Sequence, residues 1–336
     1  MTPIAEFEGV DAAAFRDDVS RRDAPAVLRG LVADWPAVRR AREAPDAICA
    51  YLRPLDSGAK VTALRMPPSA RGRIFYNAGL DGFNYTSDAV TIGSVLERMA
   101  KYAALGNPAS IAVQSAPIAE CLPGFLEENR NPLLDRSVAP RIWIGNHVVT
   151  PAHFDESNNI ACVVAGRRRF TLFPPRAISA LYIGPLGYAP TGTPISLVDF
   201  AEPDAKRFPR FGEALEMAQV AELAPGDAVY IPALWWHHVE SLEKYNVLVN
   251  YWWKGWPGAA GPADSALDAL LLAILTLRRL PEAQRRNWAA IFEHYVFGAG
   301  DAAAGHIPAH RRGVLGEIPP ELAKQVREFL AAKLRP

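Results

Sequence analysis

Short apolar segments separated by turn-forming residues dominate the middle of the chain. From about residue 140 to residue 253, runs rich in Val, Ile, Phe and Tyr are separated by Gly, Pro and Asn. Short strands punctuated in this way are typical of an antiparallel β-sandwich or barrel. The strands predicted from these runs are residues 141–145, 158–166, 167–175, 227–234 and 246–253.

Helical patterns flank this β-rich region on both sides. On the N-terminal side, residues 10–23 are rich in helix formers, and residues 24–36 read as a strand and a turn that ends at a proline. Further on, apolar side chains at helical spacing predict an amphipathic helix that covers a sheet. These side chains are Ile92, Val95, Leu96 and Met99. The predicted fold is therefore mainly β with flanking helices.

The last part of the chain loses the strand pattern and becomes helical. Helices are predicted over residues 264–280, 281–298 and 319–334. The first of them has Asp264 or Ser265 as a suitable N-cap and needs burial for its apolar stripe, either on the sheet or against a second copy of the chain. The stripe consists of Leu267, Leu270, Leu271, Ile274 and Leu277. We therefore expect a domain of residues 1–255 and a helical region of residues 256–336.

Composition limits the class of protein. The 336 residues are 50% hydrophobic and carry 36 basic and 36 acidic side chains, so no basic excess favours nucleic acid. The longest apolar stretch is about half the length of a membrane span. Three cysteines without a paired spacing argue against a disulfide framework and favour a reducing cytoplasm. A soluble, cytoplasmic protein without a membrane partner is expected.

His153 and Asp155 are the first residues that indicate chemistry. They stand two apart on a predicted strand, where alternate side chains share one face. An imidazole and a carboxylate suit iron(II), manganese or zinc once a third ligand is present, although an exposed pair is the commoner explanation. The third ligand could be His237 or His238, which follow two tryptophans. Two histidines and one carboxylate would leave positions open for a co-substrate and oxygen.

Three consecutive arginines begin the next predicted strand. Arg168 shares a face with Phe170 and Leu172, whereas Arg167 and Arg169 share the other face. An inward arginine needs an anionic partner, and a dicarboxylate co-substrate would provide one. The alternative is a solvated basic face at the edge of a sheet. The residues alone leave both interpretations open.

A stretch rich in proline and glycine, residues 183–224, is too long for a tight hairpin. An insertion of this length serves either as a lid or binding loop or as a plain surface excursion. If it is a lid, the part between Gly184 and Gly212 would close over the substrate.

Four motifs occur in order along the chain: "TPAHFDESNN", "GRRRFTLFPP", "PGDAVYIPALWWHHVESL" and "VNYWWKG". They resemble the JmjC-type 2-oxoglutarate oxygenases, most closely the cupin-like group that includes the asparaginyl hydroxylase factor inhibiting HIF. The likeness extends from about Ala24 to Gly255. It implies a double-stranded β-helix of the jelly-roll or cupin type that uses iron(II), 2-oxoglutarate and O2. The implied iron ligands are His153, Asp155 and His237, with His238 pointing away.

The resemblance also implies roles around this metal. Arg168 would bind the distal carboxylate of 2-oxoglutarate, at a position where the family usually has lysine. Ala112 stands where the asparaginyl hydroxylase has a tyrosine that contacts the same carboxylate, and we expect the two departures to compensate. Polar residues around the co-substrate and metal would be Thr150, Asn159 and Asn250, and pocket-lining residues would be Gln114, Trp143 and Trp252. The helices of residues 256–336 would form a homodimer interface.

The function expected from the resemblance is hydroxylation of a side chain in a protein or peptide by a 2-oxoglutarate-dependent dioxygenase. Oxidation of a small molecule or of RNA on the same scaffold is an alternative, and the neutral net charge disfavours RNA. A metal-binding cupin without oxygenase activity, acting as a sensor or scaffold, is a further alternative. The departures at Arg168 and Ala112 keep it open.

Overall fold

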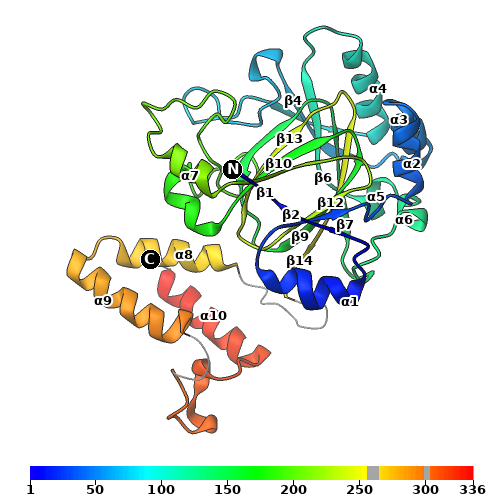
Figure 1. Ribbon diagram of the computed structural model, residues 1–336. Coiled ribbons are helices and arrows are strands. Elements are labelled where there is room, and N and C mark those ends of the chain that lie inside the picture. Colours follow the sequence, from blue (N-terminus) through cyan, green and yellow to red (C-terminus); the bar gives the residue numbers. More distant parts are fainter. Residues whose placement is uncertain (256–264, 299–302, 336) are drawn as a thin grey trace. The chain divides into compact units, whose positions relative to one another are not determined.

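Two β-sheets form the centre of the chain in the computed structural model (Figure 1). The structure describes residues 1–255, 265–298 and 303–335, and the chain divides into two units, Met1–Pro262 and Ala263–Pro336. All strands of the described residues lie in the first unit. The predicted fold class, a mainly β cupin-type fold with flanking helices and a C-terminal helical region, is confirmed.

The larger sheet has nine strands in the order β2-β3-β12-β9-β14-β7-β6-β4-β5. They are β2 (Ala5–Glu8), β3 (Ala26–Arg29), β4 (Val61–Met66), β5 (Thr86–Val90), β6 (Ser110–Pro117), β7 (Pro140–Gly145), β9 (Asn158–Ala165), β12 (Ala228–Ile231) and β14 (Asn246–Trp253). The smaller sheet has five strands in the order β1-β11-β10-β13-β8. They are β1 (Thr2–Pro3), β8 (Val149–His153), β10 (Arg168–Phe173), β11 (Gln219–Leu223) and β13 (Trp236–Ser241).

Alternate residues of the central strands face two different hydrophobic layers. In β9, Ile160 and Cys162 belong to the layer beneath the helices, whereas Ala161 and Val163 belong to the layer between the sheets. Because both faces of β9 are buried, its sequence is apolar at nearly every position. Any polar side chain on the inner face of such a strand is removed from water and needs a partner.

Helices cover the outer face of the larger sheet, and their apolar residues share one cluster with it (Figure 1). They include α2 (Pro36–Glu43), α3 (Ala47–Leu52), α4 (Ile92–Ala103), α5 (Ile118–Cys121) and α6 (Phe125–Glu128). The side chain of Thr91 caps α4 by accepting a hydrogen bond from the Ser94 N–H at 3.2 Å. All four apolar residues predicted on this helix are buried, so the predicted amphipathic helix is confirmed.

The N-terminal segment adds short helical turns before β3. They are α1 (Ala12–Ala14), a π-helical turn (Phe15–Val19) and a 3-10 turn (Ser20–Arg22). Phe15 is fully buried and meets the ring of Tyr230 edge-on, with 5.3 Å between the ring centroids. This contact fixes the helical segment against β12.

The segment between β10 and β11 packs on the outer face of the smaller sheet. It contains a 3-10 helix (Pro175–Ala180) and α7 (Phe211–Met217), whose apolar residues form one cluster with Phe173 and Trp236. The stretch Gly184–Gly212, for which a lid and a surface excursion were the alternatives, belongs to this segment. Several of its apolar side chains join the same cluster, so part of the stretch is packed rather than free in solvent.

The second unit consists of helices. They are α8 (Ala266–Leu277), α9 (Glu282–Phe292) with a π-helical turn (Glu293–Phe297), and α10 (Pro320–Leu334). Ser265 caps α8 by accepting from the Leu267 N–H, whereas the other predicted cap, Asp264, lies outside the described residues. Every residue of α8 is half-buried or exposed. None of the helices in the described residues has the length and apolar character needed to cross a bilayer.

Candidate metal centre

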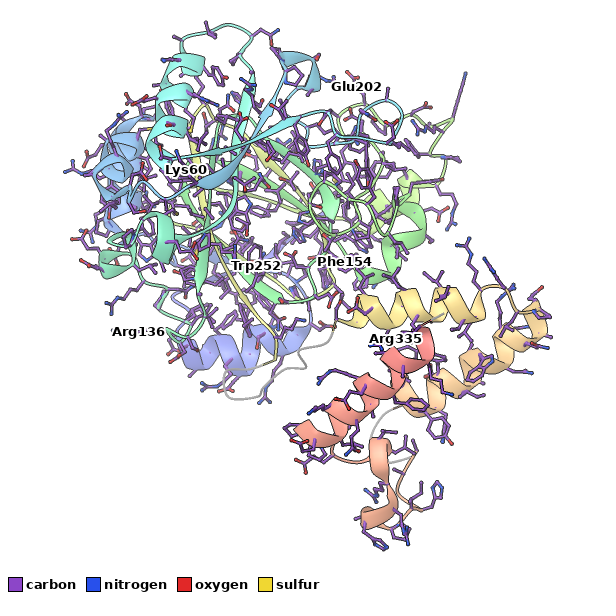
Figure 2. All side chains as sticks on the ribbon, turned by 180° about the vertical axis from the view of Figure 1, so that it is seen from behind. Lys60, Arg136, Phe154, Glu202, Trp252 and Arg335 are labelled. Carbon is purple, nitrogen blue, oxygen red and sulfur yellow. The ribbon has the colours of Figure 1, made fainter. Side chains whose placement is uncertain are left out.

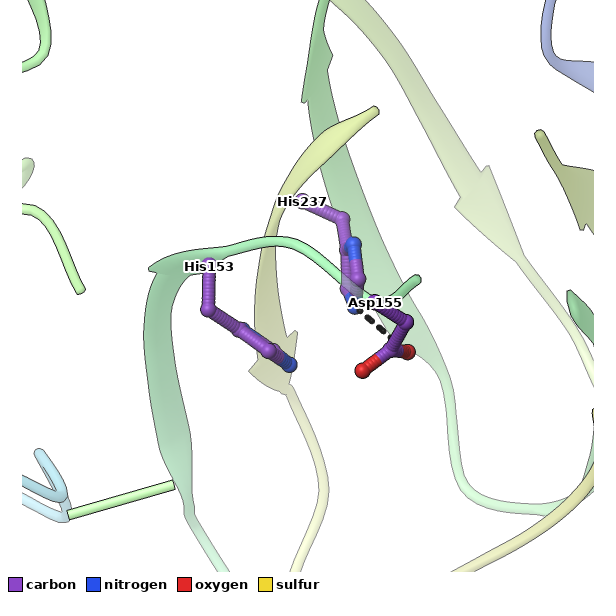
Figure 3. Close-up of side chains that lie close together, drawn as sticks. All are labelled: His153, Asp155 and His237. Carbon is purple, nitrogen blue, oxygen red and sulfur yellow. Dashed lines mark ion pairs between the residues drawn. The ribbon is translucent and has the colours of Figure 1, made fainter. Parts of the chain in front are cut away.

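His153, Asp155 and His237 converge on one point (Figure 3). One possible ligand atom from each lies within 4.8 Å of the other two. His153 is the last residue of β8, and His237 lies opposite it in β13. Asp155 lies beyond the end of β8, where its carbonyl oxygen accepts a hydrogen bond from the Leu234 N–H at 2.8 Å. The convergence of the three side chains therefore depends on the loop that follows β8 and not on the alternation of side chains along one continuous strand.

Backbone carbonyl groups determine the protonation of both imidazole rings. Nδ1 of His153 lies 2.9 Å from the carbonyl oxygen of Pro151, and Nδ1 of His237 lies 3.0 Å from that of Trp235. A carbonyl oxygen only accepts hydrogen bonds, so each Nδ1 carries a proton, and in the neutral form of each ring Nε2 has the free lone pair. This is the state that a metal-binding histidine needs.

The carboxylate of Asp155 faces one of these lone pairs. Its Oδ2 lies 3.6 Å from Nε2 of His237, whose side chain is only 6% exposed. Two acceptors so close repel each other unless a proton or a cation lies between them. Burial lowers the pKa of His153 well below its usual range, and the nearby His237 acts in the same direction. The cluster is therefore short of positive charge at neutral pH, and a divalent metal would supply it.

The donor set fits iron(II). Two neutral imidazole nitrogens and one carboxylate oxygen form the facial set of non-haem iron(II) sites and leave other coordination positions open. A structural zinc site takes four protein ligands. In the described ranges, no fourth histidine, cysteine or carboxylate joins these three residues. The arrangement is that of an open site, which suits chemistry rather than structural support.

Arg168, on β10, lies in a pocket lined by β6 and β7 and also by β8 and β13, the two strands that carry the candidate histidine ligands. It is 7% exposed and lines this pocket together with Thr150 and Ala112. Within the part of the chain that the structure describes, its Nε has no hydrogen-bond partner. Burial lowers the pKa of Arg168 to about 10, so the guanidinium is still charged at neutral pH. A buried guanidinium with an unsatisfied N–H is costly and favours an anionic ligand.

The two neighbouring arginines face the other way. Arg169 forms an ion pair with Glu222 at 2.7 Å, and Arg167 forms one with Glu243 at 3.0 Å. Both arginine side chains are more than two-fifths exposed, at 43% and 56%. The strand therefore turns one arginine inward and two outward, so each of the two interpretations of the run holds for part of it.

Residues 12–258 match the cupin-like domain family. The protein belongs to this family. The resemblance to JmjC-type and cupin-like oxygenases is confirmed, since a protein with a JmjC name is among its relatives.

Three relatives illustrate the range of the family. Human HSPB1-associated protein 1 is 32% identical over 149 residues, which are 44% of this chain and 30% of the relative. Lysine-specific demethylase JMJ31 of Arabidopsis thaliana is 38% identical over 103 residues, 30% of this chain and 18% of the relative. The tRNA wybutosine-synthesizing protein 5 of Gallus gallus is 33% identical over 149 residues, 41% of this chain and 44% of the relative. This chain thus spans less than half the length of each.

Two asparagines of this cupin-like protein form a buried pair on the inner face. Nδ2 of Asn250 donates to Oδ1 of Asn159 at 2.9 Å, across β14 and β9. Oδ1 of Asn250 has no hydrogen-bond partner among the described residues. The pair therefore presents one free acceptor to the space between the sheets.

The three residues predicted to line a substrate pocket divide into two groups. Gln114 and Trp143 line the Arg168 pocket. Trp252 instead donates its indole N–H to Oδ2 of Asp155 at 3.0 Å. Figure 2 labels Trp252 and Phe154, the residue that precedes Asp155 in the chain. The rings of Trp143 and Trp252 meet edge-on at 5.0 Å. Strand alternation from Asn250 could have placed Trp252 on the inner face, but it does not indicate this hydrogen bond.

His238 points away from the three candidate ligands but is not solvated. It is 4% exposed, and its ring stacks on Phe200 with 4.2 Å between centroids. Phe200 belongs to the stretch between Gly184 and Gly212. In the same stretch, the Ser196 N–H donates to the Ala152 carbonyl at 2.8 Å. Sequence reasoning missed both contacts, because neither Ser196 nor Phe200 belongs to a periodic pattern.

Proposed function

We propose that this cupin-like protein is an iron(II)- and 2-oxoglutarate-dependent oxygenase that hydroxylates a side chain of a protein or peptide. The observation that carries the proposal is that β8 and β13 contribute both to a His–Asp–His cluster and to the pocket of a buried arginine. A set of metal ligands alone is compatible with many kinds of cupin. A buried guanidinium in addition requires an anion. 2-Oxoglutarate meets both needs, because it has a chelating end and a distal carboxylate.

Each residue then has a specific part. His153, Asp155 and His237 would hold the iron, and Arg168 would bind the distal carboxylate beside the Thr150 hydroxyl. The free Oδ1 of Asn250 would accept a hydrogen bond from the same assembly. The bound iron and 2-oxoglutarate would supply oxidising chemistry that amino-acid side chains lack. The chain itself orients these groups and keeps bulk water out of the layer between the sheets.

The proposed substrate class is a protein or peptide side chain. Support comes from the likeness to an asparaginyl hydroxylase and from a relative that is named a lysine-specific demethylase. Another relative is named for its association with a protein, HSPB1. These likenesses leave the modified atom open, and hydroxylation and demethylation would begin with the same oxidation of a carbon.

The proposal is tested by the conversion of 2-oxoglutarate to succinate under air with added iron(II). We expect the wild-type protein to form succinate. His153→Ala should abolish it because one of three ligands is lost, and Arg168→Ala should reduce it mainly by raising KM for 2-oxoglutarate. Arg167→Ala is the matched control, since it removes an adjacent arginine whose side chain faces outward.

Two outcomes would count against the proposal. Equal losses in Arg167→Ala and Arg168→Ala would show that the inward position of Arg168 has no special part in turnover. Iron(II) binding without binding of 2-oxoglutarate under anaerobic conditions would favour the metal-binding sensor or scaffold.

A second candidate substrate is RNA, because 41% of this chain aligns with a protein named for tRNA wybutosine synthesis. The neutral net charge opposes this assignment, since tight binding to phosphates needs a basic excess. The succinate assay separates the two candidates when it is repeated with a peptide library and with bulk tRNA. Stimulation by tRNA alone would replace the protein substrate with RNA.

We also propose that α8 to α10 join two copies of the chain. The support is the large apolar surface of α8, on which Leu270, Leu271 and Leu275 are 48%, 41% and 66% exposed. Apolar patches of this kind mark interaction surfaces. A second copy is the partner that the family resemblance implies.

A further inference from the structure

The indole N–H of Trp252 donates a hydrogen bond to Oδ2 of Asp155 at 3.0 Å. From this contact we infer that Trp252 is a positioning residue, which sets the rotation of the Asp155 carboxylate toward the metal. The side chain of Asp155 is 24% exposed, so the bond is shielded from much of the solvent. The inference deepens the proposed function and rests on its metal site.

The carboxylate needs such a partner because the sheet does not hold it. Asp155 lies in a turn after β8, and an aspartate side chain has several rotamers available where packing does not restrict it. Its Oδ2 also lies 3.6 Å from Nε2 of His237, which is beyond the usual hydrogen-bond distance, so this contact does not set the rotation of the carboxylate. Donation from the indole holds Oδ2 and leaves the other oxygen directed to the side of His153 (Figure 3).

Trp252 is itself held in place. Its strand, β14, pairs with β9 at Trp252 itself, where Asn159 lies opposite, and with β7 as far as Tyr251, so strand pairing holds the backbone at this position. The Trp143 ring meets the indole edge-on, at 5.0 Å and 77°, which fixes the orientation of the ring. Trp143 also lines the Arg168 pocket. Through Trp252, the contact of the two rings therefore connects the Asp155 carboxylate with the pocket proposed for 2-oxoglutarate.

The next residue in the chain provides a matched comparison. Trp253 faces the opposite side of the sheet, where its ring meets Phe15 at 6.3 Å. Its Nε1 is buried and has no hydrogen-bond partner in the ranges that the structure describes. Trp-to-Phe substitution at either position removes the same atoms. Only at Trp252 does it remove a hydrogen bond to Asp155.

The test is anaerobic titration of the full chain with Co(II), a spectroscopic substitute for iron(II). The dissociation constant and the visible absorption bands of bound Co(II) are measured for the wild type, Trp252→Phe and Trp253→Phe. A further variant carries benzothienylalanine at position 252, which keeps the two-ring shape but has no N–H. Loss of an outer-shell partner typically weakens metal binding by about 10- to 100-fold. We expect this loss, with altered absorption bands, in both variants at position 252 and not in Trp253→Phe.

The outcomes separate this inference from the proposed function. Unchanged affinity and absorption bands in the benzothienylalanine variant would overturn the role of the N–H while leaving the metal site intact. Equal losses in Trp252→Phe and Trp253→Phe would assign the effect to general packing and overturn it as well. If the wild type binds no Co(II) and His153→Ala changes nothing, the metal site and the positioning role fail together.

Discussion

At the scale of residues, two departures from the family pattern meet in one pocket. Arg168 replaces the usual lysine, Ala112 replaces the tyrosine of the asparaginyl hydroxylase, and both line the same space. A guanidinium is broader than an ammonium and carries its donors in a planar fork. The methyl group of Ala112 leaves room for that fork. Under the proposed function, the pair would therefore form one unit of anion recognition rather than two independent substitutions.

This unit can be tested by exchange. Ala112→Tyr alone should weaken 2-oxoglutarate binding by about 5- to 150-fold, because overpacking of the pocket costs about 1–3 kcal/mol. The double variant Ala112→Tyr/Arg168→Lys should recover most of the affinity. Anaerobic calorimetric titration of the metal-loaded protein measures both.

Residues in contact commonly couple by about 0.5–3 kcal/mol, so a non-additive double variant is expected. Ala89→Tyr, which adds the same side chain at an exposed position of β5, serves as the control. Additive effects of the two substitutions would show that Arg168 and Ala112 act separately.

At the scale of elements, one segment supports both strands that carry the candidate histidine ligands. Ser196 bonds to the backbone of β8 one residue before His153, and Phe200 stacks on His238, one residue after His237. The segment contacts the outer face of the smaller sheet, on the side opposite the cluster of ligands. These contacts indicate that the segment supports the two strands that carry the histidines. They do not require residues 184–212 to act as a lid.

Phe200→Ala should therefore weaken metal binding, although Phe200 contacts none of the three candidate ligands. We expect the free energy of unfolding to fall by about 0.5–3 kcal/mol, the usual range for losing a packed side chain, and Co(II) affinity to fall with it. Urea unfolding and Co(II) titration measure the two effects. Leu105→Ala, at a residue that is 54% exposed, should change neither. Reduced stability with unchanged Co(II) affinity would restrict the segment to a packing role.

At the scale of the whole molecule, the strands and the apolar helices belong to different units. The first unit contains the complete candidate site, from Ala112 to Trp252. In the second unit, Leu270, Leu271 and Leu275 of α8 are exposed. The proposed chemistry and the proposed assembly would therefore belong to separate parts of the chain, and variants can address one without changing the other.

Leu271→Glu/Leu275→Glu should separate the proposed dimer, because it places two charges on adjacent turns of the apolar face of α8. Light scattering should then give half the mass of the wild type. Succinate formation per chain should be retained. Lys60→Glu, at an exposed position of the first unit, adds an acidic residue outside the proposed interface and should leave the mass unchanged. A wild-type chain that is already monomeric would contradict the proposal.

Local periodicity explains what could be predicted. Apolar spacing predicted the strands at residues 158–166 and 246–253 and the helix with Ile92 to Met99, and the structure has all three. Such elements can be predicted because burial of one or two faces produces a regular spacing of apolar residues in the sequence. Asp155 was expected on a strand and lies in a turn instead. Its contacts with Leu234 and Trp252 join segments far apart in the chain, and no local pattern encodes them.

The sequence by itself determined that histidines, one carboxylate and three consecutive arginines are available, because residue types are a local property. Parity alone leaves His237 and His238 equivalent and leaves the burial of Arg168 open, and the choice of His237 came from the family resemblance. Only the tertiary structure shows the physical reason for that choice. The register of β13 against β8 brings His237 opposite His153, and packing of Phe200 covers His238 on the other face. Register depends on the pairing of distant strands, which is why the three candidate ligands meet only in the folded chain.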